Sequence, residues 1–277
     1  MKHHIKLIAL DMDGTLLNSQ LEITPYTRTV LERVMAQGVE IVAITGRPRC
    51  AVPKAYFDIP GIRFLITSNG AQVQNFLTGD FIYQSEMLSD TVMRIIKTLK
   101  NQDAMLEVFK DGQAYINKSF MPILDRYITD KPFRDDFILN RVTVDDFRDV
   151  VRKYHGFEKF NALFTNPEEQ AVWHQKLEEM FPEIRIVATT PGRWLEITSD
   201  TADKGTALHK LAEFLGISQE ETLAMGDSGN DIAMLQAAGI SIAMLNSPAF
   251  LKDMTDMVSD EDNDHDGAAK MIEKIVL

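Results

Sequence analysis

The sequence predicts an α/β protein with a doubly wound parallel-sheet core and an inserted α+β domain. Short, almost wholly apolar segments alternate with helical patterns near the N-terminus, and the same alternation returns near the C-terminus. Strands that are covered by helices on both faces have such continuous apolar sequences. The middle of the chain has more polar strands and few glycines, so we expect it to fold as a separate unit.

The N-terminal part predicts a βαβ unit. Ile5–Leu10 and Val39–Ile44 have the composition of buried strands. Thr24 is a suitable N-cap before a proline and Gly38 a suitable stop, so a helix is expected between these strands. Such a crossover joins parallel strands with right-handed geometry. A third strand, Phe64–Ile66, precedes an Asn-Gly turn.

The C-terminal part repeats this alternation. Its helices are expected to end at glycines, and its strands are short and apolar. The predicted elements are the helix Asp203–Leu215, the strand Thr222–Met225, the helix Asp231–Ala238, the strand Ile240–Met244 and the helix Ala268–Ile275.

The middle segment predicts the inserted domain. We place a core in residues 1–83 and 191–277 and the insertion in residues 84–190. The insertion contains no catalytic signature. Its predicted strands are Leu106–Lys110, Ala114–Asn117, Lys159–Phe164 and Ile184–Ala188, and its predicted helices are Leu88–Leu99, Val144–Tyr154 and Glu168–Met180.

The composition limits the classes of partner. The 277 residues carry a formal net charge of −12, whereas nucleic acids and anionic membranes bind basic surfaces. We therefore expect neither as a partner. The single cysteine cannot form an internal disulfide, and no apolar run reaches the ~18 residues that span a bilayer. Because no secretory signal is recognisable, a cytoplasmic location is expected.

The first cluster of polar residues, Asp11 to Gly14, follows an apolar strand. Ligands of open parallel sheets bind outside the carboxyl ends of the strands. An ionised aspartate can accept a phosphoryl group, and a carboxylate two residues later can protonate the leaving oxygen. We therefore predict that Asp11 is a nucleophile and Asp13 a general acid and base. A turn-forming pair of aspartates is the structural alternative.

Two further clusters have features of phosphate binding. Thr45 and Gly46 follow the second strand, where a hydroxyl and backbone N–H groups can surround phosphate oxygens. Lys204 begins the helix Asp203–Leu215 and supplies a cation for a phosphate. Each pattern is common by itself, since Thr-Gly forms many turns and such a lysine is usually solvated.

The fourth cluster, Gly226 to Asp231, follows the strand Thr222–Met225. It places two carboxylates, Asp227 and Asp231, in a loop with two glycines. Mg²⁺ prefers a few carboxylate oxygens and completes its coordination with water and substrate phosphate. The sequence therefore predicts a magnesium cofactor.

The four clusters together resemble the motifs of the haloacid dehalogenase (HAD) superfamily. DMDGTLL, ITGRP, ADKGTAL and GDSGNDIAML occur in the order of that superfamily. The large insertion and the SNGA segment at Ser68–Ala71 are similar to its Cof-type branch. The resemblance covers the whole chain and implies a Rossmann-like core with an α/β cap domain. It also implies a phosphatase that acts on a small phosphorylated metabolite, most commonly a sugar phosphate.

The resemblance assigns roles to most of the polar motif residues. Asp11 would be the nucleophile and Asp13 the general acid and base. The carboxylates of Asp11 and Asp227 and the backbone carbonyl of Asp13 would hold Mg²⁺, with Asp231 supporting the metal site. Arg47 has no role defined by the motif. The groups expected to contact phosphate are the Met12 backbone, Thr45, Gly46, Lys204 and Asn230.

Two alternative functions remain open at this stage. A phospho-acceptor signalling module also uses Asp, Thr or Ser, and Lys around magnesium, although Asp13 and an insertion of roughly 100 residues favour an enzyme. A phosphomutase of the same fold would rebind an intermediate instead of admitting water. The sequence indicates neither the substrate nor the oligomeric state.

Two other patterns are less convincing. The segment Asp262–Glu273 matches the EF-hand calcium-loop pattern, but Lys270 would place a cation beside the ion, and Ala268–Ile275 has helical periodicity. We therefore do not predict a calcium site. Cys50 has neighbouring arginines, yet a spectator thiol is the preferred interpretation because a nucleophilic thiol needs a base or a strongly positive environment.

Overall fold

The computed structural model describes residues 4–189 and 193–277. Their contacts divide the chain into two compact units. The first unit comprises Met1–Gly46, Val52–Gln84 and Asp203–Leu277, and the second comprises Arg47–Ala51 and Ser85–Ala202. Each unit is described separately.

The first unit contains an eight-stranded sheet with the order β16-β15-β14-β1-β2-β3-β4-β5. The strands from β16 to β3 are parallel, and the β4 and β5 edge is antiparallel. The strands are β1 Leu7–Asp11, β2 Glu40–Ile44, β3 Phe64–Thr67, β4 Gln72–Asn75, β5 Phe81–Gln84, β14 Thr222–Gly226, β15 Ile240–Ala243 and β16 Met257–Val258.

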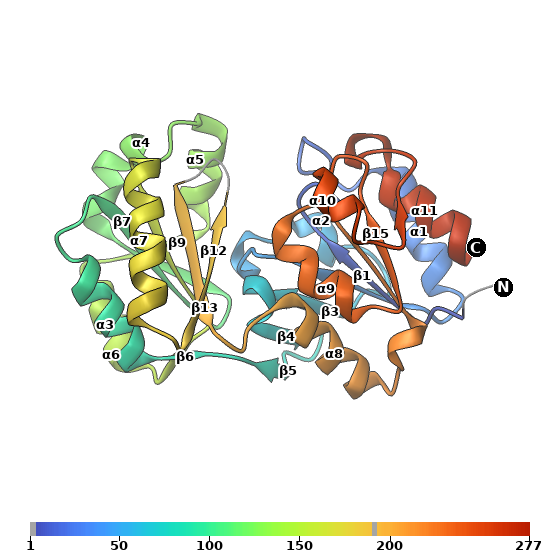
Figure 1. Ribbon diagram of the computed structural model, residues 1–277, viewed down its shortest axis with the longest axis horizontal. Coiled ribbons are helices and arrows are strands. Elements are labelled where there is room, and N and C mark those ends of the chain that lie inside the picture. The colour runs from blue at the N-terminus through green and yellow to red at the C-terminus, as the bar shows by residue number, and fades with distance from the viewer. Residues whose placement is uncertain (1–3, 190–192) are drawn as a thin grey trace. The chain divides into compact units, whose positions relative to one another are not determined.

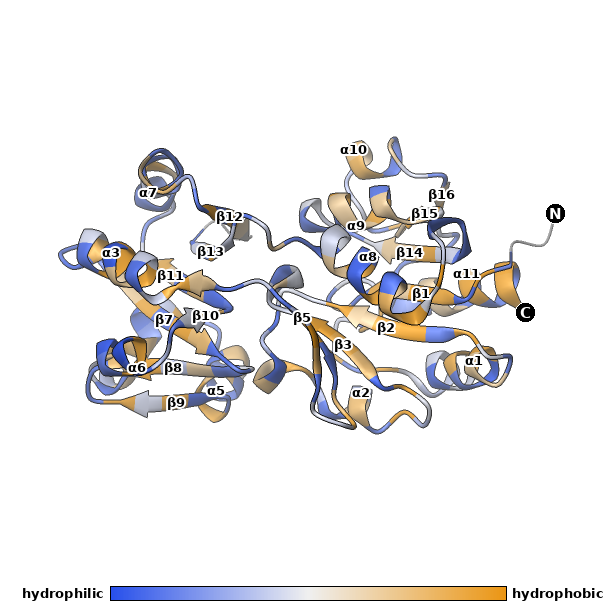
Figure 2. Ribbon diagram, turned by 90° about the horizontal axis from the view of Figure 1, so that it is seen from below, coloured by the Kyte–Doolittle hydropathy of each residue, from blue (hydrophilic) through white to orange (hydrophobic). Residues whose placement is uncertain are grey.

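Helices cover both faces of this sheet. Helices α1 (Pro25–Met35) and α11 (Gly267–Val276) lie side by side and pack on one hydrophobic cluster (Figure 1). Helices α8 (Lys204–Leu215) and α9 (Ile232–Ala237) pack on a second cluster. All five residues of β1 are buried, and Figure 2 shows β1, β2 and β3 in the colours of hydrophobic residues. The predicted doubly wound α/β fold is confirmed.

One buried tyrosine ties two strands of this sheet together. Helix α2 (Lys54–Phe57) carries Tyr56, which is fully buried. Its hydroxyl donates to the carbonyl of Phe64 in β3 at 2.7 Å and accepts from the N–H of Ala43 in β2 at 2.8 Å. Burial raises the pKa of this phenol.

Replacing Tyr56 by Phe is therefore expected to lower the free energy of unfolding by about 1–3 kcal/mol, because two buried backbone groups lose their partner. Tyr26→Phe is the matched control. Its hydroxyl also donates a hydrogen bond, to Glu273, but the residue is exposed, so we expect a change within about 0.5 kcal/mol. Urea unfolding measures both values. Equal effects of the two substitutions would contradict this account.

The second unit is an α+β structure. Its six-stranded sheet has the order β12-β13-β11-β7-β8-β9, and only β8 and β9 are parallel. A two-stranded ladder joins β6 (Met87–Leu88) and β10 (Gly156–Phe157). The sheet strands are β7 Ala104–Lys110, β8 Gln113–Asn117, β9 Arg141–Val144, β11 Lys159–Phe164, β12 Ile184–Thr189 and β13 Trp194–Ser199.

Helices pack on the two faces of this sheet as well. One cluster includes residues of α3 (Ser89–Leu99), α6 (Phe147–Lys153) and α7 (Pro167–Met180), and the other includes residues of α4 (Leu124–Tyr127) and α5 (Lys131–Leu139). The domain boundary predicted at residues 190–191 would separate β12 from β13, although these two strands are paired. The predicted domain limits stay a prediction. No helix among the described residues is both long and apolar enough to cross a membrane.

Candidate active site

Three neighbouring strands, β14, β1 and β2, end at the candidate site. Asp11 is the last residue of β1 and lies opposite Ile44, the last residue of β2. On the other side, Leu10 pairs with Met225 of β14. The strands that follow β1 in the sequence, β2 to β5, all lie on one side of it in the sheet. The first strand on its other side is β14. Such a change of direction opens a crevice at the carboxyl ends of the strands.

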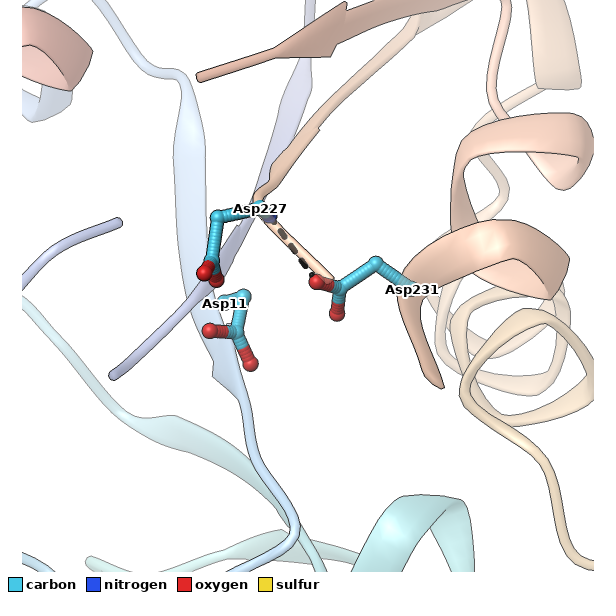
Figure 3. Close-up of side chains that lie close together, drawn as sticks. All are labelled: Asp11, Asp227 and Asp231. Carbon is cyan, nitrogen blue, oxygen red and sulfur yellow. Dashed lines mark hydrogen bonds between the residues drawn. The ribbon is translucent and has the colours of Figure 1, made fainter. Parts of the chain in front are cut away.

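Three aspartates converge at this edge of the sheet. One carboxylate oxygen from each of Asp11, Asp227 and Asp231 lies within 4.8 Å of the other two (Figure 3). These residues come from the end of β1, from the loop after β14 and from the 3₁₀ turn Gly229–Asp231. The structure therefore brings together side chains that are more than 200 residues apart in the sequence.

Lys204 reaches this cluster from the start of α8. The helix is capped by Asp203, whose side chain accepts the N–H of Thr206 at 2.8 Å. The Lys204 ammonium is fully buried and donates to Asp11 Oδ1 at 2.5 Å and to Asp231 Oδ1 at 2.6 Å. The capped first turn thus directs the lysine side chain toward the carboxylates, and its ammonium bridges two of the three.

Asp231 organises the loop that carries Asp227. Its Oδ2 accepts the backbone N–H groups of Asp227 and Ser228, each at 3.0 Å, and Figure 3 shows the first of these bonds. Since its Oδ1 accepts from Lys204, both oxygens of Asp231 are engaged in the structure. This arrangement suits a supporting residue better than a direct metal ligand.

The charges of the cluster do not balance. Three carboxylates face one lysine, which leaves a formal charge of −2 (three minus one). Burial, together with the Asp231 and Asp227 charges, raises the pKa of Asp11 well above its usual range, although Lys204 opposes the shift. Burial and the Asp231 charge raise the pKa of Asp227 to about 6. Burial would lower the pKa of Lys204, but Asp11 and Asp231 raise it above its ordinary value.

Gly14 allows the loop after β1 to approach Asp227. Its φ is +81°, and a Cβ at this position would lie 2.6 Å from Asp227 Oδ2. Any side chain would therefore be strained and would also displace a carboxylate of the cluster. The positive φ and the close approach of Asp227 thus explain why the DMDGT segment has a glycine at position 14.

The predicted phosphate-binding residues lie on the loops around this cluster. Thr45 is buried and follows β2, and Gly46 comes next. The Met12 side chain is buried in the hydrophobic core, so only its backbone is available for a ligand. Asn230 accepts a hydrogen bond from Ser228 Oγ at 2.6 Å.

Asp13 differs from the other carboxylates. Its side chain is exposed, and its backbone forms an isolated bridge with Leu17. An exposed carboxyl group two residues from a buried aspartate can exchange protons with water, which is what the predicted role of general acid and base requires.

Two asparagines at the site were not predicted from the residues. Asn69 follows β3 and accepts a hydrogen bond from Asn230 Nδ2 at 3.4 Å. Asn246 follows β15 and donates to the carbonyl of Gly14 at 2.9 Å. Both come shortly after parallel strands, but an asparagine at a strand end is also typical of a simple turn, so the sequence signal for either residue is weak.

The two less convincing patterns have structural explanations. The carboxylate of Asp264 accepts hydrogen bonds from Ser19, and that of Asp266 accepts from Thr24 and Thr27. These bonds fasten the loop before α11 to the rest of its unit. Burial raises the pKa of the Cys50 thiol, against the opposing effect of Arg141. A thiol with a raised pKa carries less thiolate at neutral pH than an ordinary cysteine does.

The sequence as a whole matches a known family. A family model described as haloacid dehalogenase-like hydrolase matches residues 8–272. The chain belongs to this family. The resemblance to Cof-type phosphatases that the four motifs predict is thereby confirmed, and the chain is an enzyme of the phosphatase type.

Individual relatives agree with this assignment. Phosphatase YwpJ of Bacillus subtilis (strain 168) is 29% identical over 291 residues, which cover 98% of this chain and 100% of the relative. The 5-amino-6-(5-phospho-D-ribitylamino)uracil phosphatase YcsE of the same organism is 30% identical over 277 residues, which cover 99% of this chain and 96% of the relative. A solved structure of a haloacid dehalogenase-like hydrolase from B. subtilis superposes with a TM-score of 0.81 at 27% identity and covers 97% of this chain and 99% of that one.

Proposed function

We propose that this protein is a magnesium-dependent phosphatase that hydrolyses a small phosphorylated metabolite through an aspartyl-phosphate intermediate. The observation that carries the proposal is the buried Asp11 carboxylate, which lies beside the Asp227 carboxylate and is bonded to Lys204. A carboxylate nucleophile, a metal-binding carboxylate and a cation are the groups that phosphoryl transfer to an aspartate requires.

The residues present suit a divalent cation. Asp11 and Asp227 provide hard carboxylate oxygens, and the backbone carbonyl of Asp13 is a third proposed ligand, so the donor set is the kind that Mg²⁺ prefers. A cation of charge +2 would balance the uncompensated −2 of the cluster. When bound, the cation would neutralise the negative charge of the carboxylates and of the substrate phosphate.

The protein groups have separate tasks in the proposed reaction. Lys204 engages Oδ1 of Asp11, so we assign the attack on phosphorus to Oδ2. As the Asp11–phosphorus bond forms and the ester bond breaks, Asp13 gives its proton to the leaving oxygen. Asp13 then removes a proton from water, which attacks phosphorus and releases Asp11 and inorganic phosphate.

The remaining groups hold the phosphate during both steps. The proposed contacts are the hydroxyl of Thr45, the backbone N–H groups of Met12 and Gly46, the Lys204 ammonium and the Asn230 amide. Positioned donors of this kind stabilise the charge on the transferring group without reorganisation. The inserted domain, which we predicted in residues 84–190, is proposed to act as a cap that selects the leaving group.

A sugar phosphate or a related phosphorylated polyol is the proposed substrate. The name of the relative YcsE specifies a phosphoribityl compound, which supports a small hydroxyl-bearing leaving group. The net charge of −12 disfavours nucleic acid as a partner. The experiment is a phosphate-release assay on a panel of phosphorylated metabolites, with Mg²⁺ and with EDTA. We expect Mg²⁺-dependent release from at least one ester, and release that is insensitive to EDTA would refute the role of the metal.

Mg²⁺ should also stabilise the folded protein. At a concentration about tenfold above its Kd, it should add about 1.4 kcal/mol to the free energy of unfolding, which corresponds to a rise of a few degrees in Tm. Differential scanning fluorimetry measures this rise. In Asp227→Asn the rise should be largely lost, because one of the two ligand carboxylates is removed. Asp264→Asn is the control, since that aspartate bonds Ser19 outside the site.

The Mg²⁺-induced rise in Tm should depend on pH. Asp227 has an ordinary pKa of 3.8, raised to about 6 in the folded metal-free protein. Its proton therefore stabilises the folded state below the ordinary pKa, and this contribution is lost as pH rises through the folded pKa. Mg²⁺ binds the deprotonated carboxylate, so the rise should be larger near pH 8 than near pH 5. A rise that does not change with pH would contradict this description of the site.

A further inference from the structure

The turn after β3 contains strain that the proposed mechanism leaves unexplained. Ser68, Asn69 and Gly70 all have positive φ angles, of 53°, 55° and 95°. The left-handed conformation is unfavourable for residues with a Cβ, and such strain is concentrated at functional sites. Ser68 and Asn69 are also buried. A glycine at position 68 or 69 would adopt this conformation without strain. The presence of Ser68 and Asn69 therefore suggests that their side chains have a role.

This turn contacts three segments that carry proposed phosphate-binding groups. The N–H of Asn69 donates to the carbonyl of Thr45 at 3.1 Å. A Cβ on Gly70 would lie 2.2 Å from the carbonyl oxygen of Asp203, so the turn packs directly on the peptide that leads into α8. The third contact is the bond from Asn230 Nδ2 to Asn69 Oδ1, at 3.4 Å. The turn is thus a common support for these three segments.

The contacts of Asn230 determine how its amide is oriented. Its Oδ1 accepts from Ser228 Oγ at 2.6 Å, and its Nδ2 donates to Asn69 Oδ1. An amide nitrogen has two hydrogens, so the same nitrogen can also donate to a second acceptor. With the oxygen and one hydrogen engaged, the direction of the second hydrogen is fixed by the plane of the amide.

We infer that Asn69 is a positioning residue that orients the Asn230 amide toward the substrate phosphate. The inference rests on the proposed function, because it needs a phosphate as the second acceptor. Asn69 acts through Asn230, and a donor that is oriented in advance costs no reorganisation when the phosphate binds. The left-handed backbone conformation of Asn69 then has a reason, because it places the Asn69 side-chain oxygen within hydrogen-bonding distance of the Asn230 amide.

The variant Asn69→Gly separates positioning from structure. Glycine adopts a φ of 55° without strain, so the variant should keep the backbone of the turn and remain folded. The variant lacks the side-chain acceptor for the Asn230 amide. The loss of one hydrogen bond corresponds to about a threefold to tenfold weaker binding of phosphate. We expect this increase in the Kd of inorganic phosphate, measured by isothermal titration calorimetry with Mg²⁺, and in the KM of an active ester.

Two further variants complete the test. Leu21 is an exposed residue of the same unit with a φ of 61°, so Leu21→Gly gives the same backbone relief and should leave the phosphate Kd unchanged. In the background Asn230→Ala, the substitution Asn69→Gly should have no additional effect on the phosphate Kd, because the two residues act as one unit.

The outcomes separate this inference from the proposed function. A wild type that releases phosphate from no ester would refute the proposed function and, with it, the inference. If the wild type is active, an unchanged phosphate Kd in Asn69→Gly would overturn the inference alone. An equal loss with and without the Asn230 side chain would overturn it as well, since Asn69 would then act by another route.

Discussion

Asp11→Asn is expected to lower kcat for phosphate release by a factor on the order of 10⁴ or more, as is usual for the loss of a covalent nucleophile. The amide has the shape of the carboxylate but does not attack phosphorus. The measurement is steady-state phosphate release with the best ester of the panel. Near-normal activity would refute the assignment of Asp11.

The same substitution should leave the protein folded. Burial, Asp231 and Asp227 all raise the pKa of Asp11, so a neutral side chain reduces the repulsion within the cluster. The metal-free Tm of Asp11→Asn should therefore equal or exceed that of the wild type. Asp80→Asn, at an exposed position of the same unit, controls for the loss of one charge and should retain full activity.

Asp13→Asn is expected to lower kcat by about 10²- to 10⁴-fold, the usual contribution of a general acid or base. The loss should depend on the leaving group. An alkyl phosphate ester needs protonation of its leaving oxygen, whereas p-nitrophenyl phosphate releases a stable phenolate without it. The comparison of kcat/KM for the two substrates therefore reports on proton transfer. Because the Asp13 side chain is exposed, the Tm should not change.

A different result would identify a different role for Asp13. An equal loss on both substrates would indicate that the side chain positions the metal or the loop and does not protonate the leaving group. Retained activity on the alkyl ester would remove Asp13 from the reaction altogether.

The sequence predicts the sheet and the converging aspartates because both depend on short-range patterns. The apolar runs before Asp11 and Asp227 identify parallel strands, and the strand-end rule places both residues at one edge of the sheet. The sequence does not predict that Lys204 bonds Asp11 and Asp231, because the strand-end rule does not give the direction of a side chain at the start of a helix. That geometry depends on how α8 packs on the sheet.

The helices and strands of the inserted segment are predicted less accurately than those of the core. The helix expected to begin at Val144 begins at Phe147, because Val144 ends strand β9 and the Asp146 side chain caps the helix. Helix α5 and the strand Trp194–Ser199 were not predicted at all. This strand pairs with β11 and β12, and these pairings depend on contacts that are distant in the sequence.

Asn69 shows why the sequence does not identify every residue that lies beside the candidate site. The SNGA segment resembles that of related proteins, but an asparagine after a strand is typical of a simple turn. Its significance comes from three consecutive positive φ angles and from its contact with Asn230. Neither feature can be derived from a turn dipeptide.

The central claim, that Asp11 is phosphorylated in the crevice, is tested most directly by rapid acid quenching of the enzyme with ³²P-labelled substrate and Mg²⁺. We predict a label that forms within one turnover, maps to the peptide containing Asp11, disappears within seconds and is absent with EDTA or in Asp11→Asn. A label on another residue, or phosphate release without any labelled protein, would contradict the account. A label that persists far longer would indicate a signalling module instead of a phosphatase.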